Sequence, residues 1–329
     1  MCKMKKCIYI CIAIIIAFGL VFSLTSCGEK AEKEKINVVC TIFPEYDWVK
    51  EIVGDEISNI DLTLLLDNGA DLHNFQPTVA DIAKISKCDL FIYVGGESDE
   101  WADKAIKDAS NKNMQVINLL DVLGNKAKVE EEKEGMQGET EHEHENEGEE
   151  EEEKELDEHV WLSLKNAQIF VSEISNKLAV IDKDNKEKYL ANAKLYCDKL
   201  VSLDNDYANA VNQGNIKTLL FGDRFPFRYL VDDYGLDYYA AFVGCSAETE
   251  AKFETITFLA GKVDELGLHT ILKIESSDGK IANTIKENTK DKNQQILTLD
   301  SLQSTTIKSN VTYIDVMQSN LEVLKKAIK

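Results

Sequence analysis

Positive charge is scarce in this sequence. Its 329 residues include 37 Lys plus Arg against 59 Asp plus Glu, which gives a formal net charge of −22. Nucleic acid is excluded as a partner, because a phosphate backbone attracts basic patches and no long basic run occurs. Proline is also rare, with three residues, so Pro-rich spacers are excluded. The length and the 44% hydrophobic content suit about two domains with packed cores.

Signatures of common enzymes are missing as well. No HExxH, GxSxG or P-loop pattern occurs. Four cysteines after the N-terminal region are widely spaced and form no CxxC, so a disulfide framework is not indicated. We therefore expect a binding protein and not an enzyme. A metallohydrolase is the enzymatic alternative, since a metal with carboxylates can activate water.

The N-terminus has the features of a bacterial lipoprotein signal over residues 1–26. Three lysines precede an apolar run at 8–22, which is shorter than the ~20 residues of a spanning helix. The sequence at 24–27, Leu-Thr-Ser-Cys, resembles a lipobox, which implies cleavage before Cys27 and a lipid on its thiol. Residues 27–35 would then be a tether that holds the protein at the outer face of the cell membrane. The alternative is an uncleaved signal anchor.

Most of the acidity lies in one segment. Residues 130–158 hold 17 Asp plus Glu and two Lys, so this segment contributes −15 of the net −22. Such a composition cannot bury apolar surface, and we expect a disordered insert over residues 126–157. The insert is either a solvated loop or, through His142 and His144, a weak local metal reservoir.

Strand-like and helix-like segments alternate on both sides of this insert. That order predicts an α/β fold of two similar lobes, each a mainly parallel sheet flanked by helices. The N-terminal lobe is expected over residues 36–182 and the C-terminal lobe over 213–329. An uninterrupted helical pattern at 183–212 predicts a long, rigid linker helix of about 40 Å between them. We expect a monomer.

Histidine is scarce, with five residues, so each position is informative. His269 falls at a helix-to-strand turn and suits the surface. His73 lies in Leu-His-Asn-Phe-Gln-Pro after a predicted strand, where open α/β sheets bind ligands. His159 lies in Asp-Glu-His-Val-Trp-Leu, just after the acidic segment. Imidazole nitrogens together with carboxylates suit a divalent transition metal.

These segments together resemble the metal-specific solute-binding lipoproteins of ABC importers, which take up zinc or manganese. The family's Pro-His-Asp-Tyr-Glu-Pro-like motif corresponds to residues 72–77, its acidic, His-rich insert to 130–158, and its Asp-Pro-His-Val-Trp-Leu motif to 157–162. The resemblance covers residues 36–329. It implies a metal between two lobes joined by one helix, four ligands beginning with His73 and His159, and delivery to a membrane permease with its ATPase. Some relatives are called adhesins, which makes a surface adhesin or a metal-buffering lipoprotein the alternative.

The chain departs from the family at the third ligand. The family has Phe-His-Asp-Ala-Phe-Gly-Tyr, or Glu for the His, where gapless alignment here places Arg224. Arginine stays protonated and cannot ligate a metal. A shift of one residue supplies Asp223, which could instead pair with a neighbouring arginine or cap a helix. Cys245 is a further candidate, and its thiolate would favour zinc over manganese, although a buried small side chain is the simpler interpretation.

The fourth ligand is expected in the loop after a predicted strand near residue 274. Glu275 fits the zinc-type motif by spacing, and Asp278 fits the manganese-type motif with a short gap. Either carboxylate could instead cap the helix that starts near residue 280. The sequence therefore predicts capture of Zn²⁺, with Mn²⁺ as the alternative cargo.

Overall fold

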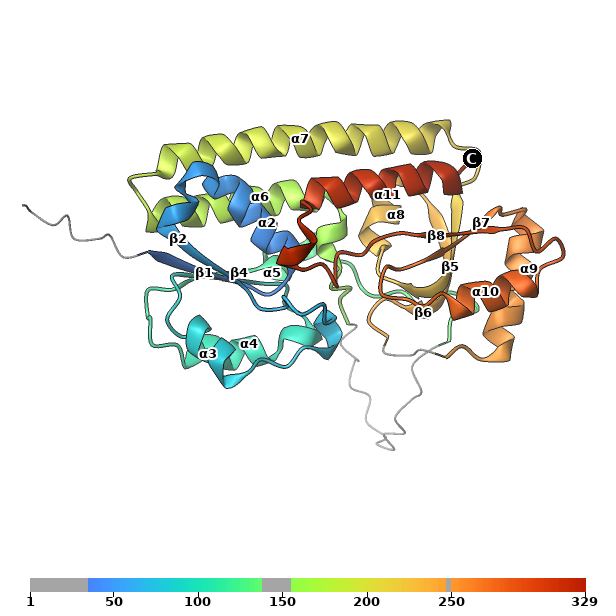
Figure 1. The fold of residues 1–329 in the computed structure, drawn as a ribbon, viewed down its shortest axis with the longest axis horizontal. Helices are drawn as coiled ribbons and strands as arrows, with labels where there is room; N and C mark the ends of the chain where they lie inside the picture. The colour runs from blue at the N-terminus through green and yellow to red at the C-terminus, as the bar shows by residue number, and fades with distance from the viewer. Residues whose placement is uncertain (1–34, 138–154, 247–249) are drawn as a thin grey trace, which may run out of the picture. The chain divides into compact units, whose positions relative to one another are not determined.

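The structure is a computed structural model that describes residues 35–137, 155–246 and 250–329. Two four-stranded parallel sheets organise these residues (Figure 1). The N-terminal sheet has the order β2-β1-β3-β4 and consists of β1 (Ile36–Cys40), β2 (Ile60–Leu64), β3 (Leu90–Tyr93) and β4 (Gln115–Asn118). The C-terminal sheet has the order β6-β5-β7-β8 and consists of β5 (Thr218–Phe225), β6 (Asp237–Val243), β7 (Thr270–Lys273) and β8 (Gln295–Thr298). The predicted α/β fold with two similar halves is confirmed.

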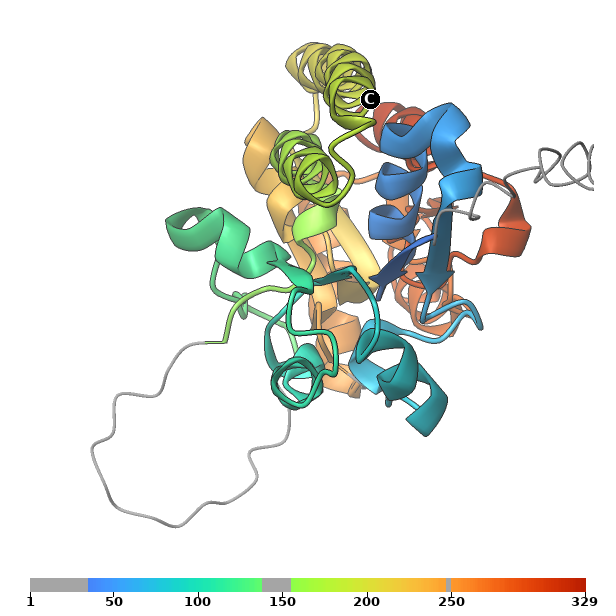
Figure 2. The same cartoon turned by 90° about the vertical axis from the view of Figure 1, so that its left-hand side faces the viewer.

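Helices cover both faces of the N-terminal sheet, as the two views show (Figures 1 and 2). They are α2 (Phe43–Val53), α3 (Val79–Ile85), α4 (Trp101–Lys107), α5 (Leu119–Leu123) and α6 (Leu164–Ile181). Alternate strand residues serve the two faces, because successive side chains point to opposite sides of a sheet. Val39 and Phe91 pack in the cluster under α3 and α4, whereas Val38 and Ile92 belong to the larger core with α2 and α6.

The C-terminal sheet is covered in the same manner. Its helices are α8 (Arg228–Tyr234), α9 (Phe253–Leu266), α10 (Lys280–Glu287) and α11 (Tyr313–Ala327). Leu220 and Ile271 pack in one apolar cluster with residues of α9 and α10, and Leu219 and Leu272 pack in the large core with residues of α8 and α11. The large core contains residues of both sheets, so the two halves share one apolar interior.

Helix α7 (Lys186–Gln213) runs past the helices of both halves (Figure 1). Its 28 residues correspond to about 42 Å at 1.5 Å per residue. Near its start, Asn192 donates to the carbonyl of Ile52 in α2 at 2.9 Å. Near its end, Tyr207 donates to the carbonyl of Met317 in α11 at 2.6 Å. One helix therefore contacts both halves, as a strut between lobes requires.

The two ends of the acidic segment are described, at residues 126–137 and 155–157. They pair through an antiparallel bridge between Val129 and Leu156, so they have defined contacts where the composition predicts disorder. The candidate residues Cys27, His142 and His144 lie outside the described residues. Within the described ranges, no helix is long and apolar enough to cross a membrane.

Candidate metal centre

His73 lies beyond the end of β2, in a short 3₁₀ helix at Leu72–Asn74. Asp71 caps this turn, since its side chain accepts a hydrogen bond from the His73 amide at 3.1 Å. The side chain of His73 is 7% exposed. Its Nδ1 lies 2.8 Å from Oγ of Ser98 and 3.3 Å from a carboxylate oxygen of Glu158. These two contacts fix the orientation of the ring and direct its Nε2 towards His159.

His159 is fully buried at the entrance to the 3₁₀ helix Val160–Leu162. Its amide and its Nδ1 both face the same oxygen of Asp157, at 2.9 and 3.1 Å. The carboxylate therefore holds the ring through Nδ1, and Nε2 is the nitrogen that faces His73. Glu158, the residue between them, is aimed at His73. Burial alone would raise the pKa of Glu158, but hydrogen bonds from His73 and Ser98 lower it below its ordinary value.

The two imidazoles meet edge to edge. Nε2 of His73 lies 3.1 Å from Nε2 of His159. At this distance one ring donates to the other, in a direction set by the tautomers, and a shared cation would take the place of that proton. In a tetrahedral zinc site two imidazole nitrogens lie about 3.3 Å apart, as metal–nitrogen distances of 2.0–2.1 Å require. The observed separation fits a common metal ion.

Cys245 lies two residues beyond the end of β6 and completes a group of three donors. Its Sγ and the ring nitrogens of His73 and His159 all lie within 4.8 Å of one another. Burial, reinforced by the carboxylates of Glu130 and Glu158, raises the pKa of the Cys245 thiol. A metal ion that binds there must therefore displace the thiol proton.

Gly244 brings the β6 end close to the histidines. A Cβ atom at this position would lie 2.9 Å from Cε1 of His159 and 2.9 Å from the carbonyl oxygen of Phe225. Because the second of these contacts is backbone, only a glycine fits without displacement. This close approach sets the position of Cys245 relative to His159.

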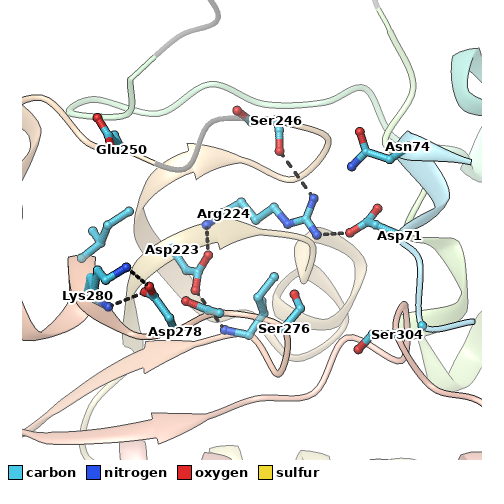
Figure 3. A pocket seen from close by; sticks show the side chains of 14 residues that line it. Asp71, Asn74, Asp223, Arg224, Ser246, Glu250, Ser276, Asp278, Lys280 and Ser304 are labelled. Atoms are coloured by element: carbon cyan, nitrogen blue, oxygen red, sulfur yellow. Dashed lines mark hydrogen bonds and ion pairs between the residues drawn. The ribbon is translucent and has the colours of Figure 1, made fainter.

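Arg224 and Asp223 both lie away from the imidazole pair. Between Phe221 and Arg224 two residues of β5 lie opposite one residue of β6, which marks a bulge in the strand. Arg224 forms an ion pair with Asp71 and approaches the carbonyl of Ser246 (Figure 3). Asp223 accepts from the amides of Arg224 at 3.0 Å and Ile274 at 3.4 Å. Burial raises the pKa of Asp223, although these hydrogen bonds oppose the shift.

The two carboxylates expected for the fourth ligand also have other partners. Glu275 accepts from the amide and hydroxyl of Ser301, at 2.7 and 2.9 Å, and from the hydroxyl of Ser304 at 3.0 Å. Asp278 accepts from the amide of Lys280, the first residue of α10, at 2.9 Å and lines a separate cavity of about 500 Å³ that Asp223 also lines (Figure 3). The structure thus brings His73, His159 and Cys245 together and places Asp223, Glu275 and Asp278 elsewhere.

Three residues near the imidazoles, Gln303, Glu130 and Ser98, were not predicted from the sequence as parts of the site. The amide of Gln303 lies between Asp71 and His159; with its nitrogen turned to Asp71 at 2.7 Å, its oxygen lies 2.8 Å from Nε2 of His159. Glu130 accepts from the Cys245 amide at 3.0 Å. Ser98 contacts His73 as described above. The spacing Asp-x-His, present at both histidines, is the one local signal that could have indicated their orienting carboxylates.

Fold and site together define a two-lobed α/β protein with a candidate transition-metal centre where its halves meet. A sequence profile of the ZnuA family, described as "Zinc-uptake complex component A periplasmic", matches residues 38–327, and the chain belongs to that family.

Relatives of known name support the assignment. The chain is 30% identical over 317 residues to the "Zinc-binding lipoprotein AdcA" of Streptococcus pneumoniae (strain ATCC BAA-255 / R6), covering 96% of this chain. It spans only 60% of that relative's length. It is also 30% identical over 312 residues to the "High-affinity zinc uptake system protein ZnuA" of Bacillus subtilis (strain 168), covering 93% of each chain.

Solved structures show the same fold. The Zn(II)-bound ZnuA-like domain of S. pneumoniae AdcA is 28% identical with a TM-score of 0.69, over 89% of this chain and 99% of that one. The metal-dependent lipoprotein YcdH from B. subtilis is 28% identical with a TM-score of 0.71, over 90% and 100%. The laminin-binding protein Lmb of Streptococcus agalactiae, at 24% identity, shares the fold.

Proposed function

We propose that this protein captures Zn²⁺ outside the cytoplasmic membrane and delivers it to the permease of an ABC importer. The observation that carries the proposal is the pair of imidazole Nε2 atoms 3.1 Å apart, with the His159 ring held through Nδ1 by Asp157 and the Nδ1 of His73 3.3 Å from a carboxylate oxygen of Glu158. Carboxylate–imidazole pairs of this kind orient metal-bound histidines and strengthen their bond to the metal. The names of the relatives, two of which specify zinc, support the same cargo.

The donor set favours zinc over manganese. Cys245 adds a soft thiolate to two imidazoles, and such donors suit zinc, whereas manganese prefers carboxylates, carbonyls and water. The carboxylates that would favour manganese, Asp223 and Asp278, are engaged away from the imidazoles. Mn²⁺ should therefore bind more weakly than Zn²⁺.

The lipobox at 24–27 supports anchoring through Cys27 at the outer face of the membrane. This position suits a receptor that hands its cargo to a permease and its ATPase in the same membrane. The surface adhesin is a weaker candidate, because similarity to the laminin-binding structures shows the fold alone. A metallohydrolase is disfavoured, because the relatives are named for zinc binding and uptake and no nucleophile or base motif accompanies the site.

Metal titration of the purified protein tests the proposal. At a free zinc concentration of 100 times Kd, binding should stabilise the fold by about 2.7 kcal/mol, measured as a rise in Tm. The same concentration of Mn²⁺ should give a smaller rise. A Tm that neither metal changes would contradict the proposed function.

A further inference from the structure

The two described ends of the acidic segment form a short ladder beside the candidate metal centre. The amide of Glu130 donates to the carbonyl of Glu155 at 2.9 Å, and the amide of Asp157 donates to the carbonyl of Lys128 at 2.8 Å. Asp157 in turn holds His159. The ladder therefore fixes the backbone of Glu130 relative to the imidazole pair.

The segment that contains Glu130, residues 128–137, also contacts the C-terminal half. Lys128 pairs with Asp232 at 2.8 Å, and Glu131 accepts from Arg228. Further along, the Gln137 amide donates to the carbonyl of Ala241 in β6 at 2.9 Å. Glu130 lies within this run of contacts, so its position is set from both halves of the molecule.

The Glu130 side chain points towards Cys245. Its Oε1 accepts from the Cys245 amide at 3.0 Å, and the Cys245 thiol also hydrogen-bonds to the carboxylate. Glu130 lines a cavity of about 330 Å³ together with His73, Glu158 and Cys245. Its carboxylate thus shares one space with two of the three donors.

We propose that Glu130 is the fourth zinc ligand and completes a His₂CysGlu site from the edge of the acidic segment. This inference rests on the proposed function. Zinc replaces the Cys245 thiol proton, which leaves to the solvent, and the Glu130 carboxylate turns from that thiol to the metal. One thiolate and one carboxylate neutralise Zn²⁺, so the buried centre carries no net charge, which avoids the cost of a buried unpaired charge.

Asp71 and Gln303 also offer oxygens on the Nε2 side of the imidazoles, and both residues are weaker candidates. Asp71 lies 3.9 Å from Nε2 of His73, but it is paired with Arg224 and accepts from the His73 amide. Gln303 offers a neutral amide oxygen, which would leave the centre charged, and zinc in proteins is held by Cys, His, Asp and Glu. In the described structure, the Glu130 hydrogen bonds that involve its side chain are to Cys245, which itself joins the metal.

The first test compares Glu130→Gln with Glu155→Gln in the full protein. Glu155 lines the same cavity from the opposite strand of the ladder, so the two variants lose the same charge at nearly the same place. Zinc affinity is measured by competition with a chelator. Glu130→Gln should weaken Zn²⁺ binding by at least about 10-fold relative to Glu155→Gln, the lower limit for loss of a group that orients a ligand.

A second pair of variants separates a ligand from an orienting group. Glu130→His places an imidazole nitrogen at about the reach of the carboxylate oxygen, and Glu155→His is its control. With Co²⁺ as the probe, the visible absorption bands of the bound metal should shift in Glu130→His, because a nitrogen ligand replaces an oxygen ligand, and remain at the wild-type positions in Glu155→His.

The outcomes distinguish this inference from the proposed function. Wild-type zinc binding with equal affinities in the two Gln variants, or unchanged cobalt spectra in both His variants, overturns Glu130 as a ligand and leaves the receptor function intact. Failure of the wild-type protein to bind Zn²⁺ overturns both.

Discussion

The two halves of the candidate metal centre are built in opposite ways. The N-terminal half supplies His73 and His159, and in each case an aspartate two residues earlier accepts a hydrogen bond from the histidine's backbone. The C-terminal half offers three acidic residues near its strand ends, Asp223, Glu275 and Asp278, and each of them is engaged elsewhere. Cys245 is its contribution to the described donor group.

The difference lies in what orients each side chain. The backbone of each N-terminal histidine is capped by an aspartate two residues earlier, and the same aspartate also holds the His159 ring, whereas the His73 ring contacts the distant Ser98 and Glu158. In the C-terminal half the deciding partners are distant: Arg224 pairs with Asp71, 153 residues away, and Glu275 binds Ser301, 26 residues away. Local positioning should make His159 robust to changes elsewhere, whereas the thiol half should depend on how closely β6 approaches.

The largest loss of zinc affinity is expected when either histidine is replaced. His159→Ala or His73→Ala should reduce zinc affinity on the order of 1,000-fold, above the about 10–100-fold that loss of an orienting group costs. Each variant removes one of two converging Nε2 donors. Competition with a chelator measures the change. His269→Ala, at an exposed position, is the matched control and should bind like the wild type. Equal affinity in all three variants would show that zinc binds elsewhere.

Removal of the Cys245 thiol should lower zinc affinity less than removal of either histidine. Cys245→Ser should lower zinc affinity on the order of 100-fold, because a serine hydroxyl replaces a thiolate that zinc prefers. The preference for Zn²⁺ over Mn²⁺ should narrow in the same variant. Cys197→Ser, a half-buried thiol between α6 and α7, serves as the control. If Cys245→Ser retained the full zinc preference, the thiol would have no place in the centre.

A smaller effect tests the close approach of β6. Gly244→Ala puts a methyl group 2.9 Å from both the His159 ring and the Phe225 carbonyl, so the histidine or the strand end must move. Zinc affinity should fall by about 10-fold, as for disturbed ligand orientation.

Gly261→Ala provides the control for that substitution. Gly261 lies in α9 with no atom within 4 Å of an added Cβ. This variant should keep zinc affinity and gain about 0.5–1 kcal/mol of stability, because alanine suits a helix interior better than glycine. Unchanged affinity in Gly244→Ala would indicate that the β6 end adjusts without disturbing His159.

The contrast between local and distant orientation also explains how far the sequence could predict this molecule. Alternating segments gave the two parallel sheets, because βα order and apolar runs are local properties. The same alternation of segments predicted that His73 and His159 lie in loops. The bulge between Phe221 and Arg224 is invisible in sequence, and so are the distant partners of Asp223 and Arg224. The contacts of Glu130 and Gln303 depend on packing between segments far apart in the chain.

Substitution of Glu45, a buried carboxylate of the N-terminal half, should leave zinc affinity unchanged and alter only the pH dependence of stability. Glu45 is fully buried, and burial together with Asp99 raises its pKa to about 8 from an ordinary 4.5. The folded state therefore binds this proton more tightly than the unfolded state does. Its contribution to stability is present below pH 4.5 and is lost as pH rises through about 8.

Glu45→Gln should remove the loss of stability that ionisation of Glu45 causes as pH rises. The amide oxygen can still accept from the Thr41 amide, which lies 2.8 Å from the carboxylate, and it carries no charge at any pH. Between pH 5 and 8 the wild-type free energy of unfolding should fall more steeply than that of the variant, by up to about 1.4 kcal/mol per pH unit. Denaturant unfolding at several pH values, with a chelator present, measures both slopes. Parallel slopes would mean that Glu45 ionises without cost, and that the burial of acidic groups does not set the pH dependence of the N-terminal half.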